Sequence, residues 1–214
     1  KLSTTIQDQI RIGTLLKNKY GFKVEEETNL NRTDFLRKSD EFFRKANEND
    51  YLLYYYAGHG QKENDRGFWI PVNAHLDKDY DWVDIFNIQK YASKSKAKKI
   101  LFIIDSCFAG MISRGLDFDT SINNDTKSLT RVAIAAGSYD KPVSDVGPED
   151  SRHSPFAEAL KSSLEEFSES NIFSSFELFE KIQNHFPENS SQEPKWSIVG
   201  RANHEDGDFT FSLN

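Results

Sequence analysis

The chain has 214 residues, of which 37% are hydrophobic and 29% are charged, so it is long enough to bury a core and has the composition of a soluble globular protein. Its formal net charge of -7 argues against nucleic acid as a partner. No apolar run approaches the roughly 20 residues that span a bilayer, so we expect no membrane partner. The single cysteine, Cys107, excludes an intrachain disulfide and fits a reducing compartment, so we expect a cytoplasmic protein.

The first half of the chain alternates between helical and strand patterns. Asn31 resembles an N-cap, with Asp34 three residues further on, and begins the second helix. The run YLLYYYA is too short for a typical helix and predicts a buried strand. In chain order, the predicted elements are a helix over 4–18, a short strand over 22–26, a helix over 31–47, a strand over 51–57 and a strand over 68–72.

The second half continues this alternation. Its most apolar run, ILFII, predicts a central strand. The predicted elements are a helix over 82–93, strands over 100–104 and 131–136, two helices capped by Ser154 and Ser175, and an edge strand or hairpin after an Asp206-Gly207 turn. The stretches 113–130 and 140–152 are polar or rich in charge and are predicted as loops. Apolar strands that alternate with amphipathic helices predict an α/β fold with a mostly parallel sheet, and no domain boundary is visible in residues 1–214.

Two of the predicted strands end in glycine-rich sequence that carries reactive side chains. The strand 51–57 leads into Gly58-His59-Gly60, and the strand 100–104 leads into Asp105-Ser106-Cys107. Sites in open α/β sheets form at the carboxyl ends of the strands. If these two strands are parallel neighbours, His59 and Cys107 emerge at the same edge of the sheet.

This pair of residue types fits nucleophilic catalysis. A free thiol is only a few per cent thiolate at neutral pH, and a neighbouring imidazole activates it by holding its proton. The backbone N–H groups of Gly60 and Cys107 are candidates for an oxyanion hole. The alternative is that Cys107 is a small core residue and His59 a loop residue. The joint occurrence of both at strand ends favours a Cys–His site.

The segments YYYAGHG and ILFIIDSCFAG resemble the two catalytic signatures of the caspase-like peptidases, which include caspases, metacaspases, paracaspases and bacterial relatives. In caspases the histidine lies about 50 residues before the cysteine, and here the separation is 48 positions. Residues 67–72, 131–138 and 153–156 (HSPF) resemble further elements of that family. The resemblance implies a mostly parallel central sheet with helices on both faces. It also implies a first strand before Thr4, where only residues 1–3 are present.

The resemblance further implies a preference for basic substrates. True caspases carry Gln-Ala-Cys, whereas Asp105-Ser106-Cys107 is similar to metacaspases and paracaspases, in which this Asp lines the pocket for the P1 residue, the residue before the scissile bond. Asp8 matches a second pocket acid, and Asp145 is a candidate for a third. Such carboxylates repel one another unless a cation offsets them, and a P1 Arg supplies one with bidentate hydrogen bonds. Ala57 departs from the pattern, because metacaspases have a pocket Ser there.

Calcium, which metacaspases often need, is not favoured here. The acidic run Asp77, Asp79, Asp81 and Asp84 offers oxygen ligands but is interpreted as a solvated loop, and Arg114 stands where a ligand is expected. We expect no metal site and no cofactor, and the remaining histidines, at 75, 153, 185 and 204, are interpreted as surface or structural residues. Self-cleavage after Arg114, Lys127 or Arg131 is a hypothesis, because relatives are cut in this region.

The leading hypothesis is therefore an endopeptidase that cuts proteins or peptides after Arg, and less well after Lys, through His59 and Cys107. Two alternatives remain: a catalytically idle caspase-like scaffold, and a caspase-like protease that prefers acidic P1 residues. The family's bacterial members often accompany sensor domains, so the resemblance makes a sensor or activator partner and a role in defence or cell death plausible.

Overall fold

A computed structural model describes residues 4–113, 128–138, 153–167, 172–186 and 192–213. Three of the predicted site and cleavage residues, Arg114, Lys127 and Asp145, lie outside the described residues. Residues 1–3, all that the chain holds before Thr4, also lie outside them. Among the helices that the structure describes, none combines the length and apolarity that a membrane crossing requires.

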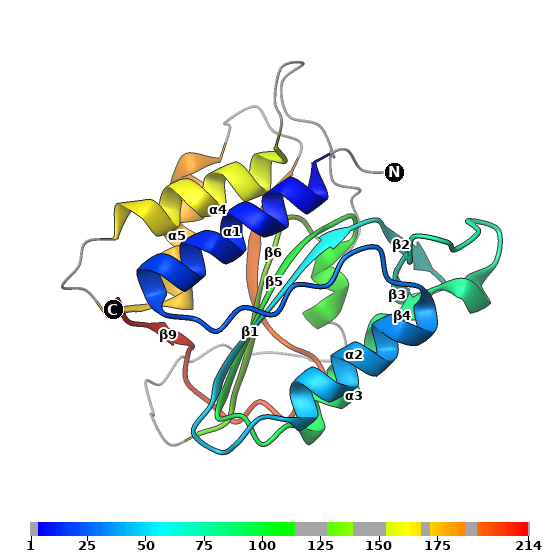
Figure 1. Cartoon of the computed structure of the whole chain (residues 1–214), viewed down its shortest axis with the longest axis horizontal. Coiled ribbons are helices and arrows are strands. Elements are labelled where there is room, and N and C mark those ends of the chain that lie inside the picture. The colour runs from blue at the N-terminus through cyan, green and yellow to red at the C-terminus, as the bar shows by residue number, and fades with distance from the viewer. Residues whose placement is uncertain (1–3, 114–127, 139–152, 168–171, 187–191, 214) are drawn as a thin grey trace.

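The elements follow one another as an α/β chain (Figure 1). The helices are α1 (Thr5–Tyr20), α2 (Arg32–Arg44), α3 (Ile85–Lys94), α4 (Pro155–Glu166) and α5 (Ser175–His185). The strands are β1 (Tyr51–Gly58), β2 (Gly60–Glu63), β3 (Arg66–Trp69), β4 (Val83–Asp84), β5 (Lys99–Ser106), β6 (Thr130–Ala135), β7 (Phe173–Ser174), β8 (Lys195–Ile198) and β9 (Thr210–Phe211). Two short 3-10 turns cover Asp79–Asp81 and Ala109–Ser113.

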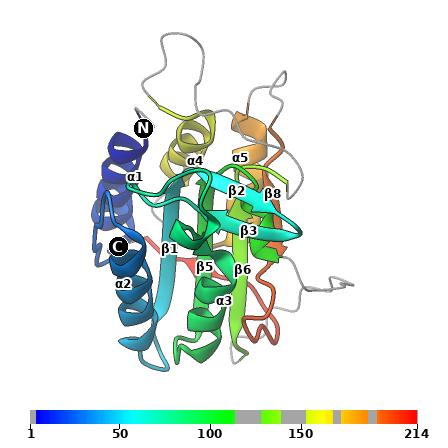
Figure 2. The same cartoon turned by 90° about the vertical axis from the view of Figure 1, so that its right-hand side faces the viewer.

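The central sheet has the order β1-β5-β6-β8, in which β1, β5 and β6 are parallel and β8 is antiparallel. Its two faces are covered by different helices (Figure 2). Alternate side chains of β5 enter the two cores: Leu101 and Ile103 pack with α1, α4 and α5, whereas Ile100, Phe102 and Ile104 pack with α2 and α3. These observations confirm the predicted α/β fold with a mostly parallel sheet between helical layers.

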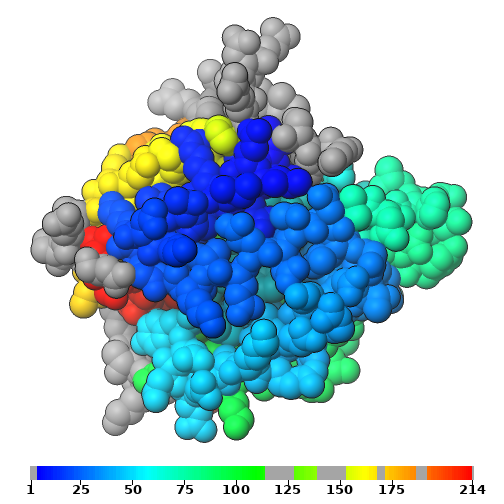
Figure 3. All heavy atoms as spheres, in the orientation of Figure 1, coloured from blue at the N-terminus to red at the C-terminus, as the bar shows by residue number. Residues whose placement is uncertain are grey.

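The predicted strand over 22–26 is wrong. Residues 21–30 form no strand and cross from α1 to α2 over the β1 edge of the sheet (Figure 1). A strand needs a partner for its backbone hydrogen bonds, and nothing in the described part of the chain pairs with this segment. Figure 3 shows α1, α2 and the segment between them spread over this side of the molecule.

The prediction that residues 51–57 are a buried strand is right about the strand but wrong about its burial. Every residue of β5 and β6 is buried, whereas in β1 only Tyr56 is buried. β1 lies at the edge of the described sheet, and an edge strand is covered by strands on one side only.

Three local predictions are refined. Asn31 caps α2 as predicted, since its side chain accepts a hydrogen bond from the N–H of Asp34. The cap of α5 is Ser174 rather than Ser175, in a capping box with Glu177. The C-terminal strand β9 pairs with β7 rather than forming a local hairpin.

A hairpin that was not predicted, β2–β3, projects to one side of the sheet together with the segment that follows it (Figures 1 and 3). Its turn residues Asn64 and Asp65 have φ values of 45° and 68°. Positive φ at two successive turn residues is typical of two-residue hairpin turns, and Asn and Asp tolerate this conformation better than most residues.

Candidate active site

The register of β1 and β5 brings the two predicted catalytic residues to the same end of the sheet. Gly58 pairs with Ser106 in a parallel ladder, so the residues that follow, His59 and Cys107, leave the sheet side by side. His59 is exposed and Cys107 is half-buried. A Cys–His nucleophile needs an imidazole within reach of an accessible thiol, and the placement of these two residues at adjacent strand ends is compatible with that requirement.

Gly60 lies against the backbone of the cysteine. A Cβ atom on Gly60 would lie 2.1 Å from the carbonyl oxygen of Cys107 and 2.4 Å from Ser106 Oγ. No other residue type fits there without moving the strand end, which gives a steric reason for a glycine after the histidine.

The backbone N–H of Gly60 is not used by the hairpin ladder. Gly60 faces Trp69 across β2–β3, and the N–H of Ile70 donates to the carbonyl of His59 at 3.0 Å. In an antiparallel pair this pattern marks a non-hydrogen-bonded position, at which the N–H points away from the partner strand. The orientation is compatible with the predicted oxyanion role.

The residue after the nucleophile has an unusual backbone. Phe108 has φ = 54°, a left-handed conformation that bulky residues rarely adopt. Strained conformations of this kind cluster at functional sites, where the surrounding structure holds them. Here the bend directs the chain from β5 into the Ala109–Ser113 turn and leaves Cys107 at the point of reversal.

Tyr56 holds the loop that carries His59, a role that the sequence did not reveal. Its hydroxyl donates to the carbonyl oxygen of His59 at 2.9 Å, and its ring stacks on Trp69 with centroids 4.1 Å apart. Burial is the main cause that raises the pKa of Tyr56, so the hydroxyl stays a proton donor. In the sequence, this tyrosine is indistinguishable from the core aromatics beside it.

The two predicted pocket acids that the structure describes, Asp8 and Asp105, are brought together by one serine. Ser154 Oγ lies 2.5 Å from Asp105 Oδ2, and the N–H of Ser154 donates to Asp8 Oδ2 at 3.2 Å. The same hydroxyl accepts the N–H of Ala157 at 2.9 Å and so caps α4, as predicted. Asp8 is 1% exposed and Asp105 is 8% exposed, so both carboxylates are largely withdrawn from water.

Two further residues surround these acids. His153, interpreted from the sequence as a surface or structural residue, contacts one of the two acids, since its Nδ1 lies 2.5 Å from Asp8 Oδ1. The pKa of Tyr55 is raised well above its usual value, mainly by burial and then by the charges of Asp105 and Asp8. Its buried hydroxyl has no hydrogen-bond partner among the described residues. Buried polar groups are nearly always hydrogen-bonded, so this hydroxyl is an unusual feature of the region around the two acids.

Arg131, one of the three candidate cleavage points, lies in β6 with its side chain fully buried. Its guanidinium donates to the backbone carbonyls of Ser95, Lys98 and Thr130, and burial lowers its pKa to about 10. The bond after Arg131 is therefore in the middle of the sheet, and this placement speaks against cleavage there in the folded chain.

The acidic run that was considered for calcium does not form a cluster of free ligands. Asp81 pairs with His75 at 2.8 Å, and Asp84 pairs with Arg66 while it caps α3. Within the described ranges, no three His, Cys, Asp or Glu side chains are arranged to hold a metal ion.

A model of the caspase domain matches residues 1–202, nearly the whole chain. The chain belongs to the caspase-domain peptidase family. No curated protein matches the sequence.

Solved structures share the caspase-like fold. Caspase-1 from Spodoptera frugiperda is 17% identical, with a TM-score of 0.64 over 93% of this chain and 79% of that one. A structural-genomics protein from Geobacter sulfurreducens is 13% identical, with a TM-score of 0.66 over 96% of this chain and 89% of that one. Family membership makes the chain a cysteine peptidase by class.

Proposed function

We propose that this caspase-family chain is a cysteine endopeptidase that hydrolyses proteins or peptides after Arg, and less well after Lys, through Cys107 and His59. The observation that supports the proposal is the pairing of Gly58 with Ser106 in adjacent parallel strands, since His59 and Cys107 are the next residues of those two strands. The junction of Asp8 and Asp105 through Ser154 supports the basic P1 preference.

The reaction follows from the chemistry of these groups. His59 accepts the thiol proton, and Cys107 Sγ attacks the scissile carbonyl to form a tetrahedral intermediate, whose negative oxygen the N–H groups of Gly60 and Cys107 stabilise. His59 then protonates the leaving amine as the C–N bond breaks. Water, deprotonated by His59, attacks the thioester and releases the acid and the free thiol.

The P1 assignment follows from charge. Carboxylates with little access to water favour a cationic side chain, and a guanidinium forms two hydrogen bonds to a carboxylate where an ammonium is a point charge. The acidic P1 residue that true caspases accept would add a further negative charge beside Asp105 and Asp8 and would be repelled.

A set of fluorogenic peptides tests the proposal. We expect the chain to release the fluorophore from peptides with Arg at P1, to do so more slowly with Lys, and to do neither when Cys107→Ala is introduced. Release only from peptides with Asp at P1 would overturn the pocket assignment. If no fluorophore is released from the Arg, Lys or Asp peptide at excess protein, with or without calcium, the result would favour a scaffold or an enzyme that requires an activator.

Mass spectrometry of the same two proteins tests self-cleavage in the segment between the described ranges 4–113 and 128–138. We expect fragments that end at Arg114 or Lys127 from the native chain alone. Equal fragments from native chain and Cys107→Ala would attribute the cuts to a contaminating protease.

A further inference from the structure

Tyr54 and Tyr55 are neighbours in β1, but their hydroxyl groups have different surroundings. The two rings lie on opposite faces of the sheet, since Tyr54 packs with the core under α2 and α3 and Tyr55 with the core under α1, α4 and α5. The hydroxyl of Tyr54 is hydrogen-bonded to Ser39 Oγ at 2.8 Å. The hydroxyl of Tyr55 is buried and has no hydrogen-bond partner in the described part of the chain. Its capacity to donate and to accept is therefore unused.

The fold places this hydroxyl near the two candidate pocket acids. Tyr55 pairs with Ile103 across the parallel ladder, and Asp105 is the next residue of β5 on the same face of the sheet. Asp8 reaches the same region from the first turn of α1, and Ser154 joins the two carboxylates. Burial, and then the charges of Asp105 and Asp8, raise the pKa of Tyr55, as is expected when both carboxylates are near. The hydroxyl therefore keeps its proton.

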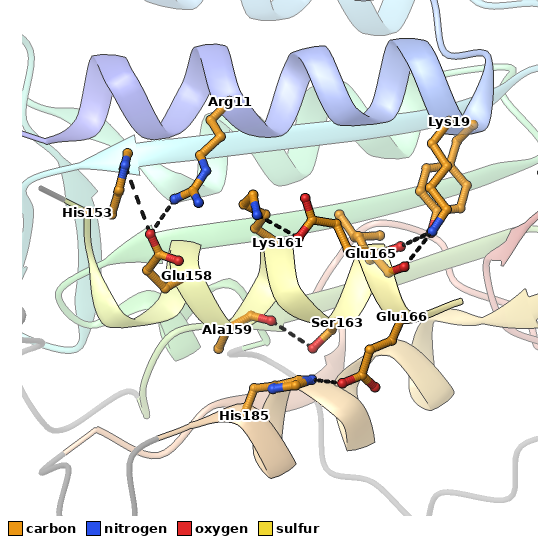
Figure 4. A network of polar contacts seen from close by, with 12 residues as sticks. Arg11, Lys19, His153, Glu158, Ala159, Lys161, Ser163, Glu165, Glu166 and His185 are labelled. Carbon is orange, nitrogen blue, oxygen red and sulfur yellow. Dashed lines mark hydrogen bonds and ion pairs between the residues drawn. The ribbon is translucent and has the colours of Figure 1, made fainter. Parts of the chain in front are cut away.

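The cations of the chain that lie along the seam between α1 and α4 have other acceptors. Figure 4 shows the guanidinium of Arg11 directed at Glu158, and Lys161 and Lys19 bonded to the last turn of α4. None of these three cations is bonded to the hydroxyl of Tyr55. A cation that donates to this hydroxyl therefore has to come from outside the described residues.

The number of donors on a bound side chain decides whether such an acceptor is needed. A guanidinium presents five N–H donors, and two bidentate contacts to carboxylates use four of them. The fifth donor needs another acceptor, because a buried donor that is left unpaired is costly. An ammonium has three donors, and the oxygens of two carboxylates are enough to accept them all.

We propose that Tyr55 is a specificity-determining residue, whose hydroxyl accepts a hydrogen bond from a P1 guanidinium and so favours Arg over Lys. The inference rests on the proposed function, since it adds an acceptor to the same pocket. A hydroxyl accepts with its oxygen and donates with its proton, so Tyr55 can donate to Asp105 or Asp8 while it accepts from the guanidinium. Substrate binding thus pairs a hydroxyl that is unpaired without substrate.

Tyr55→Phe tests the inference, because it removes the hydroxyl and keeps the ring. Each protein also carries Cys107→Ala, so that peptides bind without being cut. The probes are two acetylated tetrapeptide amides that differ only in ending in arginine or in lysine, and isothermal titration calorimetry gives the ratio of their affinities. We expect Tyr55→Phe to lower the arginine-to-lysine ratio by about tenfold, which corresponds to about 1.4 kcal/mol, with the loss confined to the arginine peptide.

Tyr54→Phe is the matched control. It removes a hydroxyl from the adjacent residue of the same strand, but this hydroxyl is paired with Ser39 on the other face of the sheet. The arginine-to-lysine ratio should stay within about twofold of the native ratio, while Tm should fall by about 2–4 °C because a hydrogen bond is lost. Without peptide, Tyr55→Phe should melt no lower than the native chain, because a buried, unpaired hydroxyl contributes no hydrogen bond that its removal could break.

An unchanged ratio in Tyr55→Phe, an equal loss of affinity for both peptides, or a lower Tm of the peptide-free variant overturns the inference. A hydroxyl that only supports the fold would give the last two of these results.

The proposed function is judged separately, from the chain that keeps Tyr55. Turnover after Arg by the Cys107-intact chain, together with a ratio that does not depend on the hydroxyl, would refute only the role of Tyr55. A hydroxyl-dependent ratio without turnover would refute the peptidase activity and leave the role of Tyr55 standing. If the chain binds neither peptide, the basic P1 preference fails and the role of Tyr55 fails with it.

Discussion

Replacement of Gly60 by alanine is the sharpest single test of the site geometry. The new Cβ atom would lie 2.1 Å from the carbonyl oxygen of Cys107, whereas Cβ contacts in proteins are essentially never below 3.0 Å. The histidine loop and the cysteine backbone must therefore separate by at least 0.9 Å, the difference between these two distances. Gly60 is not among the glycines with positive φ, so alanine is allowed there by the backbone and the effect is steric.

The expected magnitude follows from that displacement. A misplacement of about 1 Å between reacting groups costs about a hundredfold in rate, which corresponds to about 2.7 kcal/mol in the activation barrier. We therefore expect Gly60→Ala to lower kcat/KM on an arginine fluorogenic substrate about a hundredfold. Overpacking also costs about 1–3 kcal/mol of stability, so Tm should fall by several degrees.

The control for this variant is Gly13→Ala in α1. There the new Cβ would lie 3.0 Å from Glu26 Oε1 and 3.2 Å from Val24 Cγ1, the ends of side chains that can move aside. Its kcat/KM should stay within about twofold of native, since a mobile side chain relieves the contact at little cost. A Gly60→Ala protein that keeps more than about a third of the native kcat/KM would refute the close approach of the two strand ends.

Three further outcomes follow from the structure. Tyr56→Phe removes one of two donors to the histidine-loop carbonyl and should lower kcat about three- to tenfold with little change in KM, and an unchanged kcat in steady-state kinetics would contradict that role. Ser154→Ala and Ser174→Ala each remove a helix cap, so urea unfolding should show a loss of about 1 kcal/mol in the stability of both variants. Only Ser154→Ala should also raise KM for arginine substrates, and an equal rise in KM for both variants would contradict the assignment of Ser154 to the P1 pocket. Burial lowers the pKa of His204 below its usual value of 6.5, so below pH 6.5 the unfolded chain binds more protons than the folded chain, and the free energy of unfolding should fall on acidification by at most about 1.4 kcal/mol per pH unit. His204→Gln should flatten this pH dependence, whereas an equal slope in both proteins would exclude His204 as its source.

The sequence by itself determined the α/β class and the two strand ends that carry the candidate catalytic residues. The run ILFII has no helical or alternating period, and such a run is typical of a central strand that is covered on both faces. The glycines around His59 and the position of Cys107 after that strand are local features. Only the parallel pairing of β1 with β5 had to be assumed to bring them together, and the register confirms that pairing.

Other features were invisible because they depend on contacts between distant parts of the chain. The segment over 22–26 has the composition of a strand but pairs with no strand among the described residues, and its own sequence does not encode whether a strand will lie beside it. β1 is as apolar as a central strand, yet it is half-exposed because it lies at the edge of the described sheet.

The two candidate pocket acids show the same division. The sequence offered Asp8 and Asp105 as separate acids, and their charge predicted that a cation must offset them. Only the tertiary structure placed His153 on Asp8 across 145 positions of the chain and joined both acids through the cap of α4. Long-range electrostatic pairing is decided by how helices dock on the sheet, so the local pattern that predicts a helix does not reveal which charge it will meet.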